Sequence, residues 1–340
     1  MRMRSKFLST AGLALAVAGC ATVPVTGDPA VSVYATAETA PGGTGNEDAA
    51  DDPAIWRNPE DPAKSLIVGT DKKAGLHVYN LKGEDLFFLD AGLLNNVDLV
   101  DMGEQGVVVF ASDRSDLAQA RIALFRLDTA KGTLVELGSV ASGPGEAYGI
   151  CGTRRGDSLI VYTAPKSGRI GEWEIALGGA PTARELRTMQ VPSQPEGCVV
   201  DHRNGTLYIG EEAAGVWRFL PGATTGELVA AVDGRKLVAD LEGLALEPEG
   251  TDGGWLYASS QGDNTYMRYA LPDVTPAGRF RIAEGEFGGT EETDGIEAMA
   301  GDFGPAFPGG LFIAQDGMNE GQAQNFKLVP LGTIERALGD

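Results

Sequence analysis

The stretch "PEGCVVDHRNGTLYIGEEAAGVWRFLPGATTGELVAAVD", residues 195–233, decides the fold. It holds four short, largely apolar runs, and clusters of Gly, Asn, Asp, Pro and Thr that favour turns separate them. The runs cover residues 195–200, 206–212, 216–220 and 227–233. Runs this short with turns between them predict four antiparallel strands, each paired with the next.

The same unit recurs six times, and each copy opens with a small or acidic residue before an apolar run. The six openings are "DDPAIW" (51–56), "NNVDLV" (95–100), "AYGICG" (147–152), "PEGCVV" (195–200), "LEGLAL" (241–246) and "TDGIEAM" (293–299). Successive openings lie roughly 44 to 52 residues apart, which is the length of one blade of a β-propeller. The sequence therefore predicts an all-β protein, a six-bladed β-propeller.

The sixth unit lacks a fourth strand, because the chain ends at "GTIERALGD" (332–340). The segment "AVSVYATA" (30–37), ahead of the first unit, is the candidate for the missing strand. An N-terminal strand that completes the last blade would close the ring and remove two open sheet edges. We therefore expect a single propeller domain over residues 28–340.

The N-terminal residues have the features of an export signal. "MRMRSKF" (1–7) is basic, "LSTAGLALAVA" (8–18) is apolar but too short to span a bilayer, and "VAGC" (17–20) resembles a bacterial lipobox. We interpret residues 1–20 as a signal peptide whose Cys20 becomes lipidated, and residues 21–27 as a linker. A lipid on Cys20 would hold the protein in the periplasm, at the outer membrane or outside the cell.

The charge of the chain limits its partners. Its 48 Asp and Glu residues outnumber 27 Lys and Arg residues, for a net charge of −21. This balance argues against nucleic acid or an anionic membrane surface as a partner and favours chemistry that attracts cations. We expect contact with the membrane only through the lipid.

Two further cysteines lie within the propeller units. Cys151 and Cys198 both fall in apolar, strand-like stretches. We expect them to be small buried hydrophobic residues, although an oxidising compartment would permit a disulfide and the sequence leaves the pairing open.

Polar residues gather where the first strand of each unit begins and the second ends. Because neighbouring strands are antiparallel, both points lie around one mouth of the central channel. First-strand starts supply Asp51, Asp52, Asn95, Asn96, Tyr148, Glu196, Asp240, Glu242 and Asp294, and second-strand ends include Lys72, Arg114, Lys166, Glu212 and Gln261. Carboxylates crowded beside one axis repel one another unless a cation lies among them. Several Ca²⁺ ions, each taking about 6–8 oxygens, suit this set, whereas the two His lack the spacing of a zinc site.

Three cationic residues follow the second strands of three successive units. Lys72, Arg114 and Lys166 would form an arc beside the carboxylates, which suits a polyanionic phosphate bound through its oxygens. Two other functions stay open. The carboxylates could hold structural calcium in a scaffold or binding lipoprotein without catalysis, or the fold could carry a calcium-dependent lactonase. The cations favour a phosphate substrate, since a neutral lactone needs no such arc.

The sequence resembles the β-propeller phytases over nearly the whole chain after residue 20. The resemblance rests on "DDPAIW", "TDKKAGLHVY", "LNNVD", "SDRS", "YG", "PEG", "LYIGEE", "DLEGL", "SSQGDNTY", "TDGIE", "GLFIAQDG" and "QNFKLVP", which occur in this order. It implies a six-bladed propeller that requires Ca²⁺ and releases phosphate from phytate, or from its calcium complex, by metal-assisted hydrolysis. We expect it to act as a monomer.

The resemblance also assigns roles to individual residues. Those that match calcium-site positions are Asp51, Asp52, Glu196, Glu212, Asp240, Glu242, Gln261 and Asp294, together with the backbone carbonyl of Val97 and Glu38 in "AETA". Those that match phosphate-holding or cleavage-site positions are Lys72, Arg114, Lys166 and Tyr148. One position departs from the family, because Ser167 follows Lys166 where an acidic residue is often found. His77 and His202 are expected to be structural.

Overall fold

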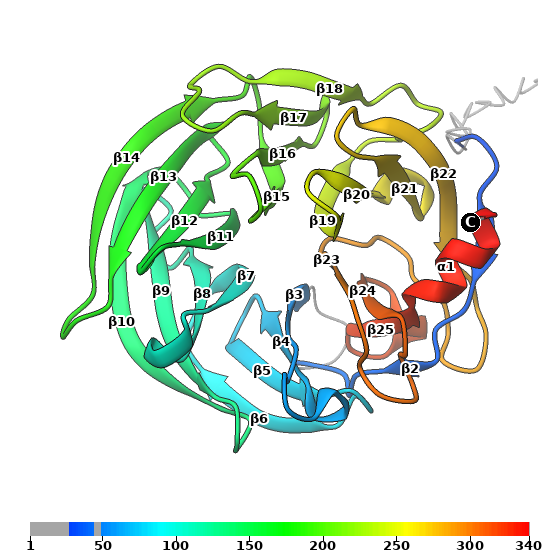
Figure 1. The fold of residues 1–340 in the computed structure, drawn as a ribbon, viewed down its shortest axis with the longest axis horizontal. Helices are drawn as coiled ribbons and strands as arrows, with labels where there is room; N and C mark the ends of the chain where they lie inside the picture. Colours follow the sequence, from blue (N-terminus) through cyan, green and yellow to red (C-terminus); the bar gives the residue numbers. More distant parts are fainter. Residues whose placement is uncertain (1–26, 44–48, 340) are drawn as a thin grey trace, which may run out of the picture.

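The computed structural model describes residues 27–43 and 49–339. Within them, six β-sheets stand in a ring around a central axis (Figure 1). The predicted six-bladed β-propeller is thereby confirmed. The first three blades consist of β3 (Ala50–Trp56), β4 (Leu66–Asp71), β5 (Gly75–Asn80) and β6 (Asp85–Asp90); β7 (Leu94–Asp101), β8 (Val107–Asp113), β9 (Gln119–Asp128) and β10 (Thr133–Pro144); and β11 (Gly149–Arg155), β12 (Ser158–Ala164), β13 (Arg169–Ala176) and β14 (Thr182–Gln190).

The last three blades follow the same plan, with additions at their outer edges. They consist of β15 (Pro195–Val200), β16 (Leu207–Glu211), β17 (Gly215–Phe219) and β18 (Glu227–Ala231); β19 (Leu241–Glu249), β20 (Gly253–Ser260), β21 (Thr265–Ala270) and β22 (Thr275–Ile282); and β23 (Ile296–Ala300), β24 (Gly310–Asp316) and β25 (Asn325–Pro330). Four 3₁₀ turns, η1 (Pro62–Lys64), η2 (Gly103–Gln105), η3 (Gln261–Asp263) and η4 (Asn319–Gly321), lie between strands. No helix in the described part of the chain is long and apolar enough to cross a membrane.

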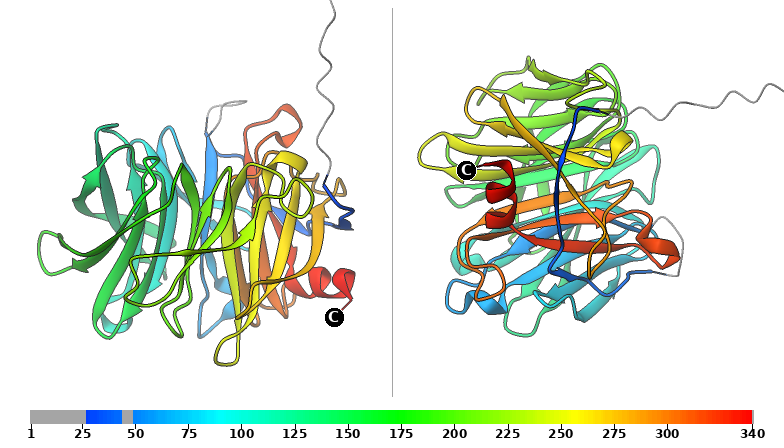
Figure 2. Two further views of the ribbon diagram at one scale, coloured as in Figure 1. Left: turned by 90° about the horizontal axis from the view of Figure 1, so that it is seen from above. Right: turned by 90° about the vertical axis from the view of Figure 1, so that its right-hand side faces the viewer.

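The ring closes differently from the prediction. Strand β1 (Val31–Val33) pairs in parallel with β22 and so adds a fifth strand to the fifth blade. Only the short β2 (Ala37–Glu38) pairs with β25 and completes the sixth blade. The N-terminal segment, dark blue in Figure 2, therefore crosses the outer edges of two blades. The prediction of an N-terminal closing strand holds for β2, but it was wrong for most of residues 30–37, because β1 covers the edge of a neighbouring blade instead.

Apolar residues between adjacent blades form the core. Between the fifth and sixth blades, Tyr266 and Phe280 pack on Phe312, with ring centroids 5.3 and 5.4 Å apart. The short helix α1 (Leu331–Leu338) buries Leu331 and Ile334 beside this interface, against β1 and β22 among other strands. Because every blade packs on two neighbours, a long ring needs no single central core.

Adjacent innermost strands approach one another closely at the channel mouth. A Cβ atom on Gly197 would lie 2.3 Å from the carbonyl oxygen of Glu242, and one on Gly295 would lie 2.4 Å from that of Asp51. Real Cβ atoms do not approach backbone oxygen this closely, so a side chain there would push neighbouring blades apart. Gly197 follows Glu196 and Gly295 follows Asp294, and the missing side chains let neighbouring inner strands approach. The acidic residues of successive blades therefore lie close together around the axis.

Cys151 and Cys198 form a disulfide, so the expectation that they are unpaired buried residues was wrong. They lie on β11 and β15, the innermost strands of neighbouring blades, with Cα atoms 5.4 Å apart. The two residues are 47 positions apart, about one blade length, and the repeat therefore sets them side by side. Sequence composition alone does not reveal this, because the pairing depends on how tightly successive inner strands pack.

Candidate active site

The strand register places the predicted polar residues at one mouth of the channel. Ala50 pairs with Asp71 across β3 and β4, and Leu94 pairs with Asp113 across β7 and β8. The start of each first strand thus faces the end of the second, as antiparallel pairing requires. Residues just beyond these points, such as Lys72 and Arg114, therefore belong to the same face.

A β-bulge interrupts the first strand pair of four blades at this mouth. The register shifts lie between Ala50 and Pro53, Leu94 and Val97, Pro195 and Cys198, and Leu241 and Leu244. A bulge sets two residues against one and changes the direction of a side chain. The bulged positions hold the acidic or amide residues of these blades, so the bulges aim their side chains at the channel. The sequence showed the polar residues but not the bulges.

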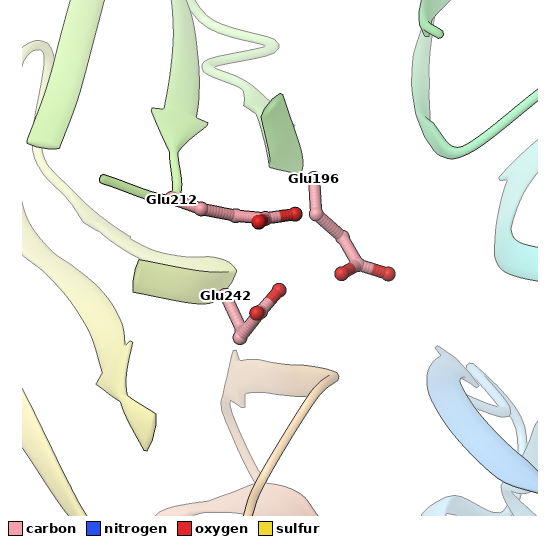
Figure 3. A group of neighbouring side chains, drawn as sticks. All are labelled: Glu196, Glu212 and Glu242. Atoms are coloured by element: carbon pink, nitrogen blue, oxygen red, sulfur yellow. The ribbon is translucent and has the colours of Figure 1, made fainter. Parts of the chain in front are cut away.

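Three glutamates from two adjacent blades form a tight group (Figure 3). Glu196 is the second residue of β15, Glu212 follows β16, and Glu242 is the second residue of β19. One carboxylate oxygen of each lies within 4.8 Å of the others. Calcium binds oxygens at about 2.3–2.6 Å, so a single ion fits between three oxygens at this spacing.

The electrostatics of this group also favour a bound cation. Burial, together with the neighbouring Glu196, raises the pKa of Glu242 well above its ordinary value. Burial also raises the pKa of Glu196, and it raises that of Glu212 to about 7. The Oε2 atom of Glu242 is buried without a hydrogen-bond donor among the described residues. A divalent cation would neutralise the charges and occupy this oxygen, so the residues fit calcium.

Lys72 lies among the carboxylates rather than in a separate arc. Its Nζ atom is 2.9 Å from Oδ1 of Asp51 and 2.9 Å from Oδ2 of Asp294. Gln261 donates from Nε2 to the other oxygen of Asp294 at 2.7 Å. Burial raises the pKa of Asp51 well above its ordinary value, and the ammonium of Lys72 opposes this shift. Lys72 therefore joins the first blade to the sixth, because its buried ammonium pairs with Asp51 of the first and with the partly buried Asp294 of the sixth.

Amide groups connect the three-glutamate group to the carboxylates around Lys72. Nδ2 of the fully buried Asn95 lies 3.0 Å from Oδ2 of Asp51 and 2.8 Å from Oε1 of Glu196. The backbone N–H of Val97 donates to Oδ2 of Asp52 at 3.1 Å, and burial raises the pKa of Asp52. Apart from Glu38 and Asp240, the predicted metal residues of blades one, four, five and six are thereby brought into one network, in which Asn95 takes a larger part than the sequence indicated.

Arg114 and Lys166 meet on the other side of the mouth. Nζ of Lys166 lies 4.6 Å from the ring centroid of Tyr148, a distance at which a cation is attracted to an aromatic face. Both cations contact Glu146, a residue that the sequence reasoning missed. Burial and the carboxylates of Glu196 and Glu242 raise the pKa of Tyr148, which keeps its phenol protonated. Tyr148 thus lies between the cations and the three-glutamate group.

Two predicted metal residues stand apart from these contacts. Glu38 is on β2 at the outer edge of the sixth blade, where it pairs with Lys327 and accepts a hydrogen bond from Asn325 at 3.1 Å. Lys327 also lies 3.4 Å from Oδ2 of Asp316, so Glu38 is linked to the end of β24 rather than to the three-glutamate group. Asp240 is exposed next to Glu242, and its negative charge is among the causes that raise the pKa of Glu212.

The opposite mouth holds a cavity of about 810 Å³. The far ends of the innermost strands line it, and His202 is among its residues. It does not include the three-glutamate group or the predicted cations. His77 is held on β5 by a 2.9 Å contact to Asp85 and by stacking on Tyr79, as a structural role requires.

The fold and the mouth define a class of protein, a β-propeller with buried carboxylates and cationic side chains side by side at one mouth. Comparison with known proteins identifies the family. The phytase family model matches residues 4–340, and the chain belongs to this family. It is 37% identical over 329 residues to a 3-phytase of Bacillus subtilis (strain 168), and the match covers 91% of this chain and 86% of the Bacillus protein.

A solved structure supports the fold. The PQQ-bound aldose sugar dehydrogenase of Streptomyces coelicolor superposes with a TM-score of 0.53 over 88% of this chain and 99% of its own. The two sequences are only 15% identical, so this likeness concerns the architecture and not the chemistry.

Proposed function

We propose that this protein hydrolyses the phosphomonoesters of phytate, releases inorganic phosphate, and depends on calcium for this reaction. The observation that carries the proposal is the position of Arg114, Lys166 and Tyr148 beside the buried three-glutamate group. Carboxylate oxygens suit a hard cation, and Lys and Arg suit phosphate oxygens. Membership in the phytase family and the identity to a 3-phytase support the same substrate.

Calcium would be held by Glu196, Glu212 and Glu242, with Asp51, Asp52 and Asp294 as further carboxylates of the same network. Bound calcium would supply charge neutralisation and a polarised water for in-line attack on phosphorus. A phytate molecule carries several phosphates, so it could use both the metal and the cationic side of the mouth.

Arg114 and Lys166 would hold the oxygens of the phosphoryl group under attack. Contacts to Glu146 would hold both cations in place before the substrate binds. Negative charge that develops on the phosphoryl oxygens would then meet hydrogen-bond donors that are already oriented. Tyr148, kept as a neutral phenol, can donate a hydrogen bond to a phosphate oxygen. Lys72, paired with Asp51 and Asp294, would orient these two carboxylates and offset part of their charge.

Release of phosphate from phytate before and after removal of calcium tests the proposal. The chelated protein should lose activity and regain it when calcium is restored. Glu242→Gln should need more calcium for half-maximal activity, whereas Glu174→Gln, which changes a surface pair with Arg184, should behave like the wild type. Full activity after complete calcium removal would contradict the calcium requirement. Inactivity on phytate together with cleavage of a lactone would favour the lactonase alternative.

We also propose that the protein is a lipid-anchored monomer on the periplasmic or outer face of the cell. Support comes from the order of the basic, apolar and "VAGC" segments within residues 1–20. These residues, Cys20 included, lie outside the part of the chain that the structure describes. Mass spectrometry of the membrane-bound protein would detect the lipid on Cys20.

A further inference from the structure

Glu146 occupies the connection between the second and third blades, after β10 and before β11. Its main chain is held from the third blade, because the N–H of Lys166 donates to its carbonyl oxygen at 3.2 Å. The preceding residue, Gly145, donates to the carbonyl oxygen of Ala118 in the second blade at 2.9 Å. Glu146 is therefore fixed at the junction of the two blades that carry Arg114 and Lys166.

The side chain of Glu146 faces both cations. Its Oε1 atom lies 3.1 Å from Nζ of Lys166 and 4.0 Å from Nη1 of Arg114. The three side chains are only 19 to 33% exposed. One carboxylate oxygen thus stands between two positive charges that would otherwise repel each other across the blade junction.

Lysine needs such a partner more than arginine does. Its ammonium is a point charge on a flexible four-carbon stem, and it must lose rotamer freedom to stay in one place. Here Nζ of Lys166 has the carboxylate of Glu146 at 3.1 Å and the ring of Tyr148 at 4.6 Å. Together these contacts fix the ammonium next to the phenol that faces the three-glutamate group.

We propose that Glu146 is a positioning residue for phosphate ester hydrolysis, which holds Lys166 and Arg114 in place before the substrate binds. The inference rests on the proposed phosphate-holding role of these two cations. Glu146 carries a negative charge, so it does not attract phosphate. It acts through the cations, and its benefit is that the donors need no reorganisation when the phosphoryl group arrives.

The test uses Glu146→Gln, which keeps the shape and removes the charge. We expect kcat on phytate to fall roughly ten- to a hundredfold, as when a supporting partner of an active-site group is lost. KM should stay the same or fall, because the site becomes more positive. The melting temperature should stay close to the wild-type value, since partly exposed ion pairs add little to stability. A purely structural role would lower the melting temperature without separating kcat from KM.

A double-mutant cycle shows whether Glu146 acts through Lys166. In a Lys166→Met background, Glu146→Gln should cause a much smaller loss of kcat than it does alone. Glu146→Asp, which keeps the charge, should be more active than Glu146→Gln and serves as a second variant if the glutamine protein folds poorly. The surface variant Glu174→Gln is the control and should keep the wild-type kcat.

Two results would overturn the inference while leaving the proposed function intact, and a third would overturn both. One is a wild-type kcat for Glu146→Gln while Lys166→Met is strongly impaired, which would leave the phosphate-holding role of Lys166 intact. The other is an equal loss of kcat from Glu146→Gln with and without Lys166. If Lys166→Met and Arg114→Gln both keep the wild-type kcat, the proposed role of the cations fails, and the inference fails with it.

Discussion

Replacing Glu242 with glutamine should change the stability of the protein in opposite directions with and without calcium. Glu242 and Glu196 are 5% and 2% exposed, and a carboxylate oxygen of one lies within 4.8 Å of a carboxylate oxygen of the other. At an effective dielectric constant of about 20, two unit charges at this separation repel by about 3.5 kcal/mol. The glutamine removes repulsion of up to this order from the calcium-free protein. In the calcium-loaded protein it removes a ligand instead.

The pH dependence of the calcium-free protein follows from the same group. The pKa of Glu212 is raised from 4.5 to about 7, and that of Glu242 is raised well above 4.5. At a pH between the ordinary pKa of a glutamate, 4.5, and its raised pKa in the folded protein, the folded protein binds more protons than the unfolded chain. The free energy of unfolding should therefore fall as pH rises from about 4.5 through about 7. Glu242→Gln removes one titrating group, so its stability should fall less over this range.

Thermal unfolding followed by circular dichroism measures both effects. At about pH 8 in a chelator, Glu242→Gln should melt above the wild type, because carboxylate repulsion is then largest. In calcium at a thousand times its dissociation constant the order should reverse, since calcium then stabilises the wild type by about 4.1 kcal/mol, more than the repulsion that the variant avoids. A variant that melts below the wild type by the same amount in both solutions would refute the reasoning. Glu242 would then be an ordinary packed residue.

Further predictions concern the cations, the disulfide and the N-terminus. Arg114→Ala and Lys166→Ala should each lower kcat on phytate roughly a hundred- to a thousandfold with little change in melting temperature. Lys72→Ala should lower the melting temperature in a chelator, because its ammonium is buried against two carboxylates, and an unchanged melting curve would contradict this. Cys151→Ala should lower the free energy of unfolding by about 4 kcal/mol, since the disulfide closes a 47-residue loop, and a denaturant titration without reductant measures the loss. Cys20→Ser should release the protein from membranes with full phytase activity, and a wild type that fractionates without lipid would contradict the anchor.

The architecture and the composition of the mouth were predictable, because both depend on short-range rules. A period near one blade length indicates a propeller, and antiparallel pairing places Lys72 and Arg114 on the face that also holds Asp51. The acidic residues could be named as a group, because like charges beside one axis require a cation. Family resemblance then added the substrate.

The contacts within the mouth could not be predicted, because they depend on packing between blades. The bulges at the inner strands decide which of two neighbouring residues faces the channel, and no residue type marks them. Glu146 precedes an apolar run like many surface glutamates, and only the junction of two blades brings it to Lys166. The same holds for Cys151 and Cys198, whose Cα separation follows from the close approach of neighbouring inner strands.

A crystal structure of the protein with calcium and inorganic phosphate tests the central claim, that carboxylates hold metal while cations hold phosphate. We predict an ion about 2.3–2.6 Å from oxygens of Glu196, Glu212 and Glu242. We also predict a phosphate bound by Arg114 and Lys166 on the side of Tyr148. Calcium bound elsewhere with the three glutamates free of metal, or phosphate bound away from both cations, would contradict the account.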